Sequence, residues 1–225
     1  MTPRPAADRR TVPAIGAVLA LIVVANLVRT VWIPGLWDFW WNVGFAASVG
    51  AVGAAAAMTA EEVGTARSTW ASGARLGAIV FAAISGVVVL AALLPFGAEQ
   101  AADERTAVSA GQMLLRVLVL IPIGTVVVEE LVFRGVLLGL ARRVASTMRA
   151  ALAVSVVFGL WHVLPVWDAG GDGRVAEMAG TFVATFVAGL GFAWLRERSG
   201  SLIAPAAAHL ATNSVTFALA WAVAR

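Results

Sequence analysis

The side chains best suited to chemistry in this chain lie inside its apolar stretches. They are Glu129, Glu130, Arg134, His162, His209 and Asn213. An ionisable group inside a membrane-length apolar segment costs about 2.5–3.5 kcal/mol on insertion scales, so each such group is a functional candidate. A carboxylate, two imidazoles and an amide also match the needs of hydrolysis: a base that activates water, groups that orient it or bind a metal ion, and an oxyanion donor.

Helix geometry gives the two adjacent acids different positions. Residues four apart share a helix face, whereas sequence neighbours point about 100° apart. Glu130 therefore faces Arg134, and we expect an ion pair that anchors the helix. Glu129 faces elsewhere, has no partner in its own helix, and is the candidate general base. The same spacing places His209 on one face with Asn213.

The elements that position these residues are apolar helices. Of 225 residues, 60% are hydrophobic and 13% are charged, and cysteine is absent, which excludes disulfide scaffolds and thiolate chemistry. Seven runs are long enough to cross about 30 Å of hydrocarbon as helices. They span residues 12–28, 39–60, 76–96, 113–141, 150–167, 178–195 and 201–224. We predict an all-α, polytopic transmembrane bundle of about seven spans with a polar cavity at mid-membrane.

The arginines predict an orientation in a cell membrane. All 16 basic residues are arginine, and ten of them lie in the N-terminal segment and in alternate connections. Short cytoplasmic loops are enriched in basic residues, so we expect the N-terminus in the cytoplasm and the C-terminus outside. The arginines never form a block, so the expected partner surface is the lipid bilayer and no nucleic acid is expected.

Depth along the helices brings the candidates together. Glu129 lies 13 residues from Arg142, His162 lies 13 residues from Arg149, and His209 and Asn213 lie 10 and 14 residues from Ser199. At 1.5 Å per residue, each would be about 15–21 Å below the arginine-rich surface. These side chains could therefore meet in one cavity.

The motifs resemble those of a known family. Glu129-Glu130-x-x-x-Arg134, Phe158-x-x-x-His162 and His209-x-x-x-Asn213 are similar in order and spacing to the three motifs of the CPBP family, the CAAX prenyl proteases and bacteriocin-processing proteins. The resemblance covers roughly residues 113–217. Within a single integral-membrane domain, we expect about three N-terminal spans in residues 1–112 and a catalytic core in residues 113–225.

The resemblance implies an intramembrane endopeptidase. Its substrate would be a peptide or protein, cleaved near its C-terminus and with or without an attached lipid. By this likeness, Glu129 activates water beside His162, and Glu130 with Arg134 supports the site. His209 with Asn213 stabilises the oxyanion or is associated with a metal ion.

A metal site is an open alternative. His162, His209 and Glu129 could supply three ligands to a catalytic zinc ion and leave one position free. The sequence has no H-E-x-x-H helix, and a water activated by Glu and His needs no metal.

Two other functions also remain open. A proton- or cation-coupled transporter uses Glu and His at the midplane, although the chain has no inverted repeat. A non-catalytic membrane immunity or partner protein of the same fold is the other alternative.

Overall fold

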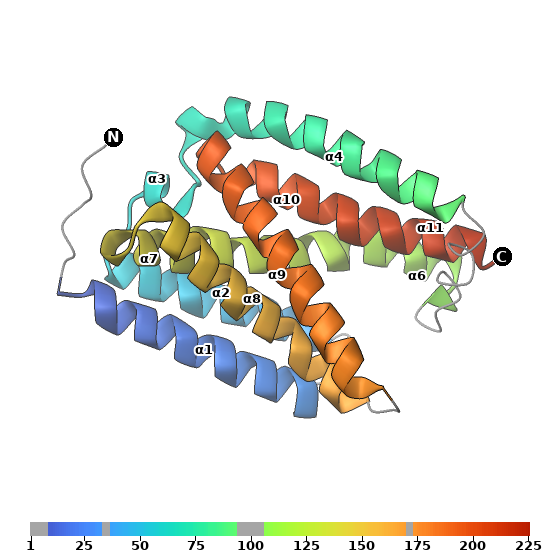
Figure 1. The fold of residues 1–225 in the computed structure, drawn as a ribbon, viewed down its shortest axis with the longest axis horizontal. Coiled ribbons are helices and arrows are strands. Elements are labelled where there is room, and N and C mark those ends of the chain that lie inside the picture. The colour runs from blue at the N-terminus through green and yellow to red at the C-terminus, as the bar shows by residue number, and fades with distance from the viewer. Residues whose placement is uncertain (1–8, 33–36, 94–105, 170–172) are drawn as a thin grey trace.

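A computed structural model describes residues 9–32, 37–93, 106–169 and 173–225, which form a bundle of long helices (Figure 1). The predicted all-α class is confirmed, since this part of the chain contains no strand. The first helices are α1 (Thr11–Trp32), α2 (Trp37–Ala55), α3 (Ala60–Val63), η1 (Arg67–Thr69) and α4 (Trp70–Ala92). The later ones are α6 (Ala110–Leu115), η3 (Arg116–Leu120), η4 (Pro122–Val127), η5 (Glu130–Leu137), α7 (Leu138–Val144), α8 (Thr147–Ala169), α9 (Arg174–Ser199), α10 (Ile203–Leu210), η6 (Ala211–Val215) and α11 (Thr216–Val223).

Six helices in the described residues are long and apolar enough to cross a membrane. They cover Thr11–Val31, Arg67–Ala92, Ala110–Val144, Thr147–Trp167, Arg174–Ser199 and Ile203–Val223. The predicted run 39–60 forms most of α2, which is not among the six and begins with polar Asp38 and Asn42 in its first two turns. A polytopic bundle is therefore correct, while about seven spans is approximate. In Figure 1, α1 begins at one end of the bundle and α11 finishes at the other.

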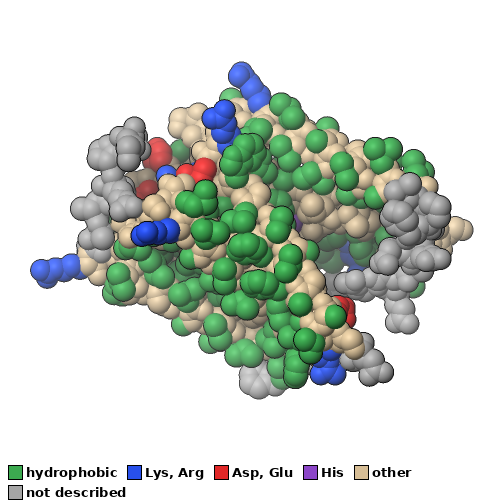
Figure 2. Space-filling view, viewed as in Figure 1, with side chains coloured by type: hydrophobic (Ala, Val, Ile, Leu, Met, Phe, Trp, Pro, Cys, Tyr) green, Lys and Arg blue, Asp and Glu red, His purple; other side chains and the backbone are tan. Residues whose placement is uncertain are grey.

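Apolar side chains cover the outside of the bundle. Val175 is 77% exposed, Leu93 76% and Ile79 67%, as expected of helices whose outer faces meet lipid. Figure 2 shows hydrophobic side chains across most of the visible face, with arginines mainly towards its edges. The exposed apolar surface is therefore a membrane surface, and which side faces the cytoplasm stays a prediction.

The span that carries Glu129 and Glu130 is largely π-helical. The segments η3, η4 and η5 follow one another between α6 and α7, and Pro122 begins η4. Proline lacks the N–H that a regular helix would use, and π-helical turns often occur at functional sites. A further π-helical segment, η6, begins two residues after His209. Glu129, Glu130 and His209 thus lie on or beside wide helical turns, whereas His162 lies within the regular helix α8.

Two arginines fix the short helix α3 at the arginine-rich end. Arg143 donates from Nε and Nη2 to the two carboxylate oxygens of Glu62, each at 2.7 Å. Arg196 Nη2 donates to the carbonyl oxygens of Glu61 and Glu62 at 2.8 and 3.1 Å. Gly64 ends α3 with φ +83°, and a Cβ there would lie 2.3 Å from Arg196 Nε. Only glycine admits both this backbone conformation and the close approach of Arg196.

Candidate active site

The predicted ion pair between Glu130 and Arg134 is present within η5. Arg134 Nη1 donates to Glu130 Oε1 at 3.2 Å, and both residues are 1% exposed. The guanidinium also lies 3.9 Å from the ring centroid of Phe158 and 4.9 Å from that of Phe192. Such stacking favours a buried cation that has few hydrogen-bonding partners. Arg134 is therefore enclosed between a carboxylate and aromatic rings.

Glu130 also contacts His209 on α10. His209 Nδ1 lies 2.9 Å from Glu130 Oε1, and both side chains are almost fully buried. A carboxylate accepts hydrogen bonds, so Nδ1 carries the proton and donates to Glu130. This contact fixes the imidazole with its Nε2 directed away from Glu130, which is how a supporting carboxylate orients a functional histidine.

Glu129 faces both histidines. Its Oε2 lies 3.8 Å from His162 Nε2 and 3.8 Å from His209 Nε2, and it makes no hydrogen bond within the described residues. His162 Nδ1 lies 2.8 Å from the carbonyl oxygen of Phe158, which can only accept, so this nitrogen is also protonated. In their neutral forms, both imidazoles therefore present a bare Nε2 towards Glu129.

Trp161 is a site residue that the sequence interpretation missed. Its indole Nε1 donates to Glu129 Oε1 at 3.1 Å, and its side chain is 2% exposed. Three residues of α1 and α2 hold it: Asn26 Nδ2 donates to the Trp161 carbonyl at 3.0 Å, Arg29 lies 4.8 Å from its ring, and Phe45 stacks on it at 5.5 Å. The available signal was its position beside His162, inside a predicted span.

Asn213 occupies a different place from the other candidates. Within the described residues, neither a hydrogen bond nor an ion pair connects it to Glu129, His162 or His209; its Oδ1 lies 3.2 Å from Thr212 Oγ1. Asn213 lines a cavity of about 900 Å³ that begins beside the motifs and extends away from the arginine-rich end. Glu129 and both histidines thus lie together, as predicted from their depth, whereas Asn213 lies on the wall of the adjoining cavity.

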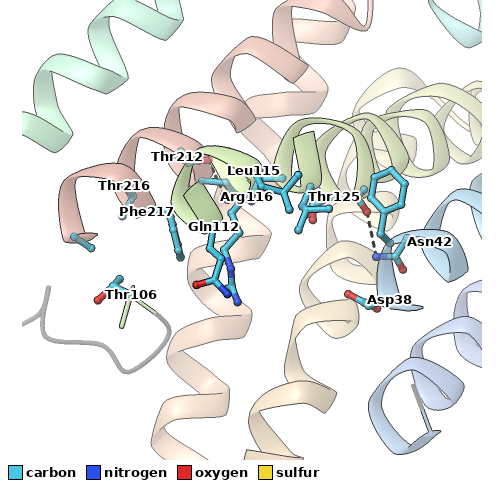
Figure 3. A pocket seen from close by; sticks show the side chains of 16 residues that line it. Asp38, Asn42, Thr106, Gln112, Leu115, Arg116, Thr125, Thr212, Thr216 and Phe217 are labelled. Atoms are coloured by element: carbon cyan, nitrogen blue, oxygen red, sulfur yellow. Dashed lines mark hydrogen bonds between the residues drawn. The ribbon is translucent and has the colours of Figure 1, made fainter. Parts of the chain in front are cut away.

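Residues from both the helix of Glu129 and the helix of His209 line the cavity (Figure 3). Gly124 and Thr125 line it about one turn before Glu129, and Thr212 and Asn213 line it about one turn after His209. Asn42 of α2 closes one side and donates to the Gly124 carbonyl at 3.1 Å. Glu129, His162 and His209 do not line this cavity themselves, but its wall comes within about one helical turn of Glu129 and of His209 along the chain.

The three side chains do not form a metal site in this arrangement. Across the described residues, no group of three His, Asp or Glu side chains is placed to hold a metal ion. Ligand atoms around tetrahedral zinc would lie roughly 3.4 Å apart, given Zn–N and Zn–O bonds of about 2.1 Å. The 3.8 Å separations are wider, although the donor types suit zinc. The zinc alternative stays a prediction.

Comparison with known families identifies the segment that carries these residues. The family model of the Rce1-like type II CAAX prenyl endopeptidases matches residues 111–215. This segment, somewhat less than half of the chain, is similar to that protease family. The matched segment contains all six predicted site residues, whereas α1 and α2 lie outside it. Comparison with curated proteins and with solved structures gives no match.

The long apolar helices indicate a multi-pass membrane protein, and the family that its second half resembles consists of prenyl endopeptidases. The catalytic role of each residue is not tested by this match and stays a prediction. The structure shows which of these side chains are in contact with one another. It also places Trp161 beside Glu129, which the motif spacing did not indicate.

Proposed function

We propose that this protein is an intramembrane endopeptidase in which Glu129 activates the attacking water. One observation carries the proposal: among the described residues, the buried Glu129 Oε2 has no hydrogen-bond partner, and it lies at equal distances from two imidazole nitrogens. Buried polar atoms are nearly always hydrogen-bonded, and an exception calls for an explanation. A water molecule that reacts with a peptide provides one.

The acceptor pattern favours a nucleophilic water. Glu129 Oε2 and the two neutral Nε2 atoms can only accept hydrogen bonds, so a bound water would donate both of its protons to them. Its lone pairs would then be free to attack a carbonyl carbon. Glu129 would take one proton as the C–O bond forms and return it to the departing amide nitrogen as the C–N bond breaks.

Two further groups would support this reaction. Trp161 and its bond to Oε1 hold the Glu129 carboxylate in one orientation, and Glu130 fixes His209. Asn213 is the proposed donor to the oxyanion, because its amide lines the cavity one turn beyond His209. The substrate is proposed to be a peptide or protein segment that reaches this cavity from the membrane, with or without an attached lipid.

The test uses detergent-purified full-length protein and a library of membrane peptides, made with and without a prenyl group and analysed by mass spectrometry. The variants are Glu129→Gln, His209→Ala and, as a matched control, Glu177→Gln, which alters an exposed acid of α9. We expect Glu129→Gln to lower cleavage by about 10²–10⁴-fold and the control to keep it. Substantial cleavage by Glu129→Gln would remove Glu129 from the role of base.

Two additional arms separate the alternatives. Cleavage that persists in a chelator argues against a metal, whereas loss that zinc restores supports one. Proteoliposomes of the same preparation report ion flux, and flux without any cleavage would favour a transporter. Peptide binding with neither cleavage nor flux would favour the non-catalytic partner protein.

A further inference from the structure

Beyond the hydrolytic residues, the cavity contains a charged group that the proposed reaction does not use. Arg116, at the start of η3, is the one cation among the described residues that line it. Its guanidinium lies 5.7 Å from the ring centroid of Phe217. Neither an acidic residue nor a hydrogen-bond acceptor within the described part of the chain is paired with it. An arginine near the end of a span can extend its side chain to the membrane surface. That alone does not explain why Arg116 lines a cavity.

The surroundings of Arg116 suit a single negative charge on an otherwise apolar ligand. Gln112 lines the cavity four residues earlier, and its Oε1 accepts from the Ser109 N–H at 2.9 Å, which leaves its amide NH₂ as a donor. Figure 3 shows the Gln112 and Arg116 side chains extending side by side from one helix. Leu115 and Phe217 supply apolar walls close by. The cavity thus offers hydrogen-bond donors and a cation at one end.

The acid that lines the cavity already has a cation of its own. Asp38 lies towards Asn42 in Figure 3, at some distance from Arg116, and its Oδ1 is 4.0 Å from Arg29 Nε. Arg29 does not line the cavity. The charge of Asp38 is therefore partly balanced by a residue outside the cavity lining, whereas Arg116 has no acidic partner among the described residues.

We propose that Arg116, assisted by Gln112, binds the C-terminal carboxylate of the peptide substrate. This inference rests on the proposed endopeptidase function. Arginine binds carboxylates through paired N–H groups, and the rest of the lining suits apolar side chains. Arg116 precedes Glu129 by 13 residues of one continuous span, which is at most about 20 Å of helix. An extended peptide covers about 3.3–3.6 Å per residue, so the cleaved bond lies no more than about six residues from the carboxylate.

The test compares two pools of apolar eight-residue peptides that differ only in a C-terminal carboxylate or a C-terminal amide. Cleavage sites, kcat and KM are measured for the wild type, Arg116→Gln and Arg174→Gln. Arg174 is a matched control, because it also stacks on an aromatic ring, that of Trp167 at 4.9 Å, but does not line the cavity. Binding of both pools to Glu129→Gln gives a readout that does not depend on cleavage.

We expect the wild type to prefer the free acid by about tenfold or more in kcat/KM, chiefly through KM, since hydrogen bonds to charged groups are the strong ones. Arg116→Gln should lose this preference and Arg174→Gln should keep it. Equal cleavage of acids and amides by the wild type, or an unchanged preference in Arg116→Gln, would overturn the inference. If nothing is cleaved, the proposed function fails, and the acid-over-amide ratio in binding still decides the role of Arg116.

Discussion

Glu62 at the arginine-rich end and Glu129 in the middle of the bundle are both glutamates held between helices, but their carboxylates are bonded differently. Both oxygens of Glu62 accept hydrogen bonds from Arg143, and Oε2 also accepts from the backbone N–H of Thr59. Glu129 has one oxygen that accepts from Trp161, and its other oxygen has no hydrogen-bond partner in the part of the chain that the structure describes. The more deeply buried carboxylate thus has fewer partners.

This difference is what we expect if Glu62 has a structural role and Glu129 has the proposed chemical role. At the arginine-rich end, each carboxylate or carbonyl group that meets Arg143 or Arg196 lowers the free energy of the folded chain. Around Glu129 Oε2, the two neighbouring Nε2 atoms of the neutral imidazoles are acceptors, so they can be bridged to this oxygen only when water or substrate supplies protons. Substitutions in the two regions should therefore change different measured quantities.

The largest expected effect is on stability, from Arg134→Met. This change leaves Glu130 buried without its cation, and breaking a buried pair costs about 3–5 kcal/mol. Chemical denaturation in detergent measures it. The control, Arg142→Met, removes the partly exposed pair with Glu197 at 3.0 Å and should cost less than about 1 kcal/mol. Equal losses in the two variants would contradict the contrast between the regions.

A smaller effect, on activity, is expected from Trp161→Phe. Phenylalanine keeps the stacking on Phe45 and removes only the Nε1–H that orients Glu129. We expect kcat to fall by about tenfold with KM nearly unchanged, since one hydrogen bond to a charged group is lost. Trp221→Phe removes an equivalent donor, to the Val108 carbonyl, and should leave kcat unchanged. A fall in melting temperature without a fall in kcat would give Trp161 a purely structural role.

The smallest effect concerns pH and Glu62. The hydrogen bond from Arg143 holds the pKa of Glu62 below its ordinary value of 4.5. A lowered pKa in the folded state adds stability that is present above pH 4.5 and is lost as the pH falls through the folded-state pKa. We expect Glu62→Gln to have a lower free energy of unfolding than the wild type at pH 7, by under about 1 kcal/mol. This difference in the free energy of unfolding should narrow towards pH 3. A difference that is constant with pH would show that the Glu62 charge contributes nothing.

The sequence predicts much of this arrangement where helix geometry alone decides it. The spacing of four residues between Glu130 and Arg134 predicts their ion pair, and the rise per residue predicts that Glu129, His162 and His209 share one depth. The ion pair and the shared depth could be predicted because each depends only on where a residue lies along its own helix. The all-α class follows from the apolar runs for the same reason.

The remaining features depend on how helices rotate against one another. Depth does not specify the direction in which a side chain faces, so Asn213 reaches the right level but lines the cavity. The bond from Trp161 to Glu129 joins α8 to a π-helical span, and only Pro122 hints at that irregularity. The arginine contacts of α3 join segments more than 80 residues apart and have no local signal.

The bond from Asn26 to the Trp161 carbonyl has a consequence for transplanting this machinery between proteins. The segment that matches the family model comprises residues 111–215. The residues that hold Trp161, and through it Glu129, extend beyond this segment into α1. A chimaera that kept only this segment would lose Asn26, Arg29 and Phe45 together. A chimaera that keeps the support of Glu129 must therefore include α1 and α2 in addition to the segment that matches the family model.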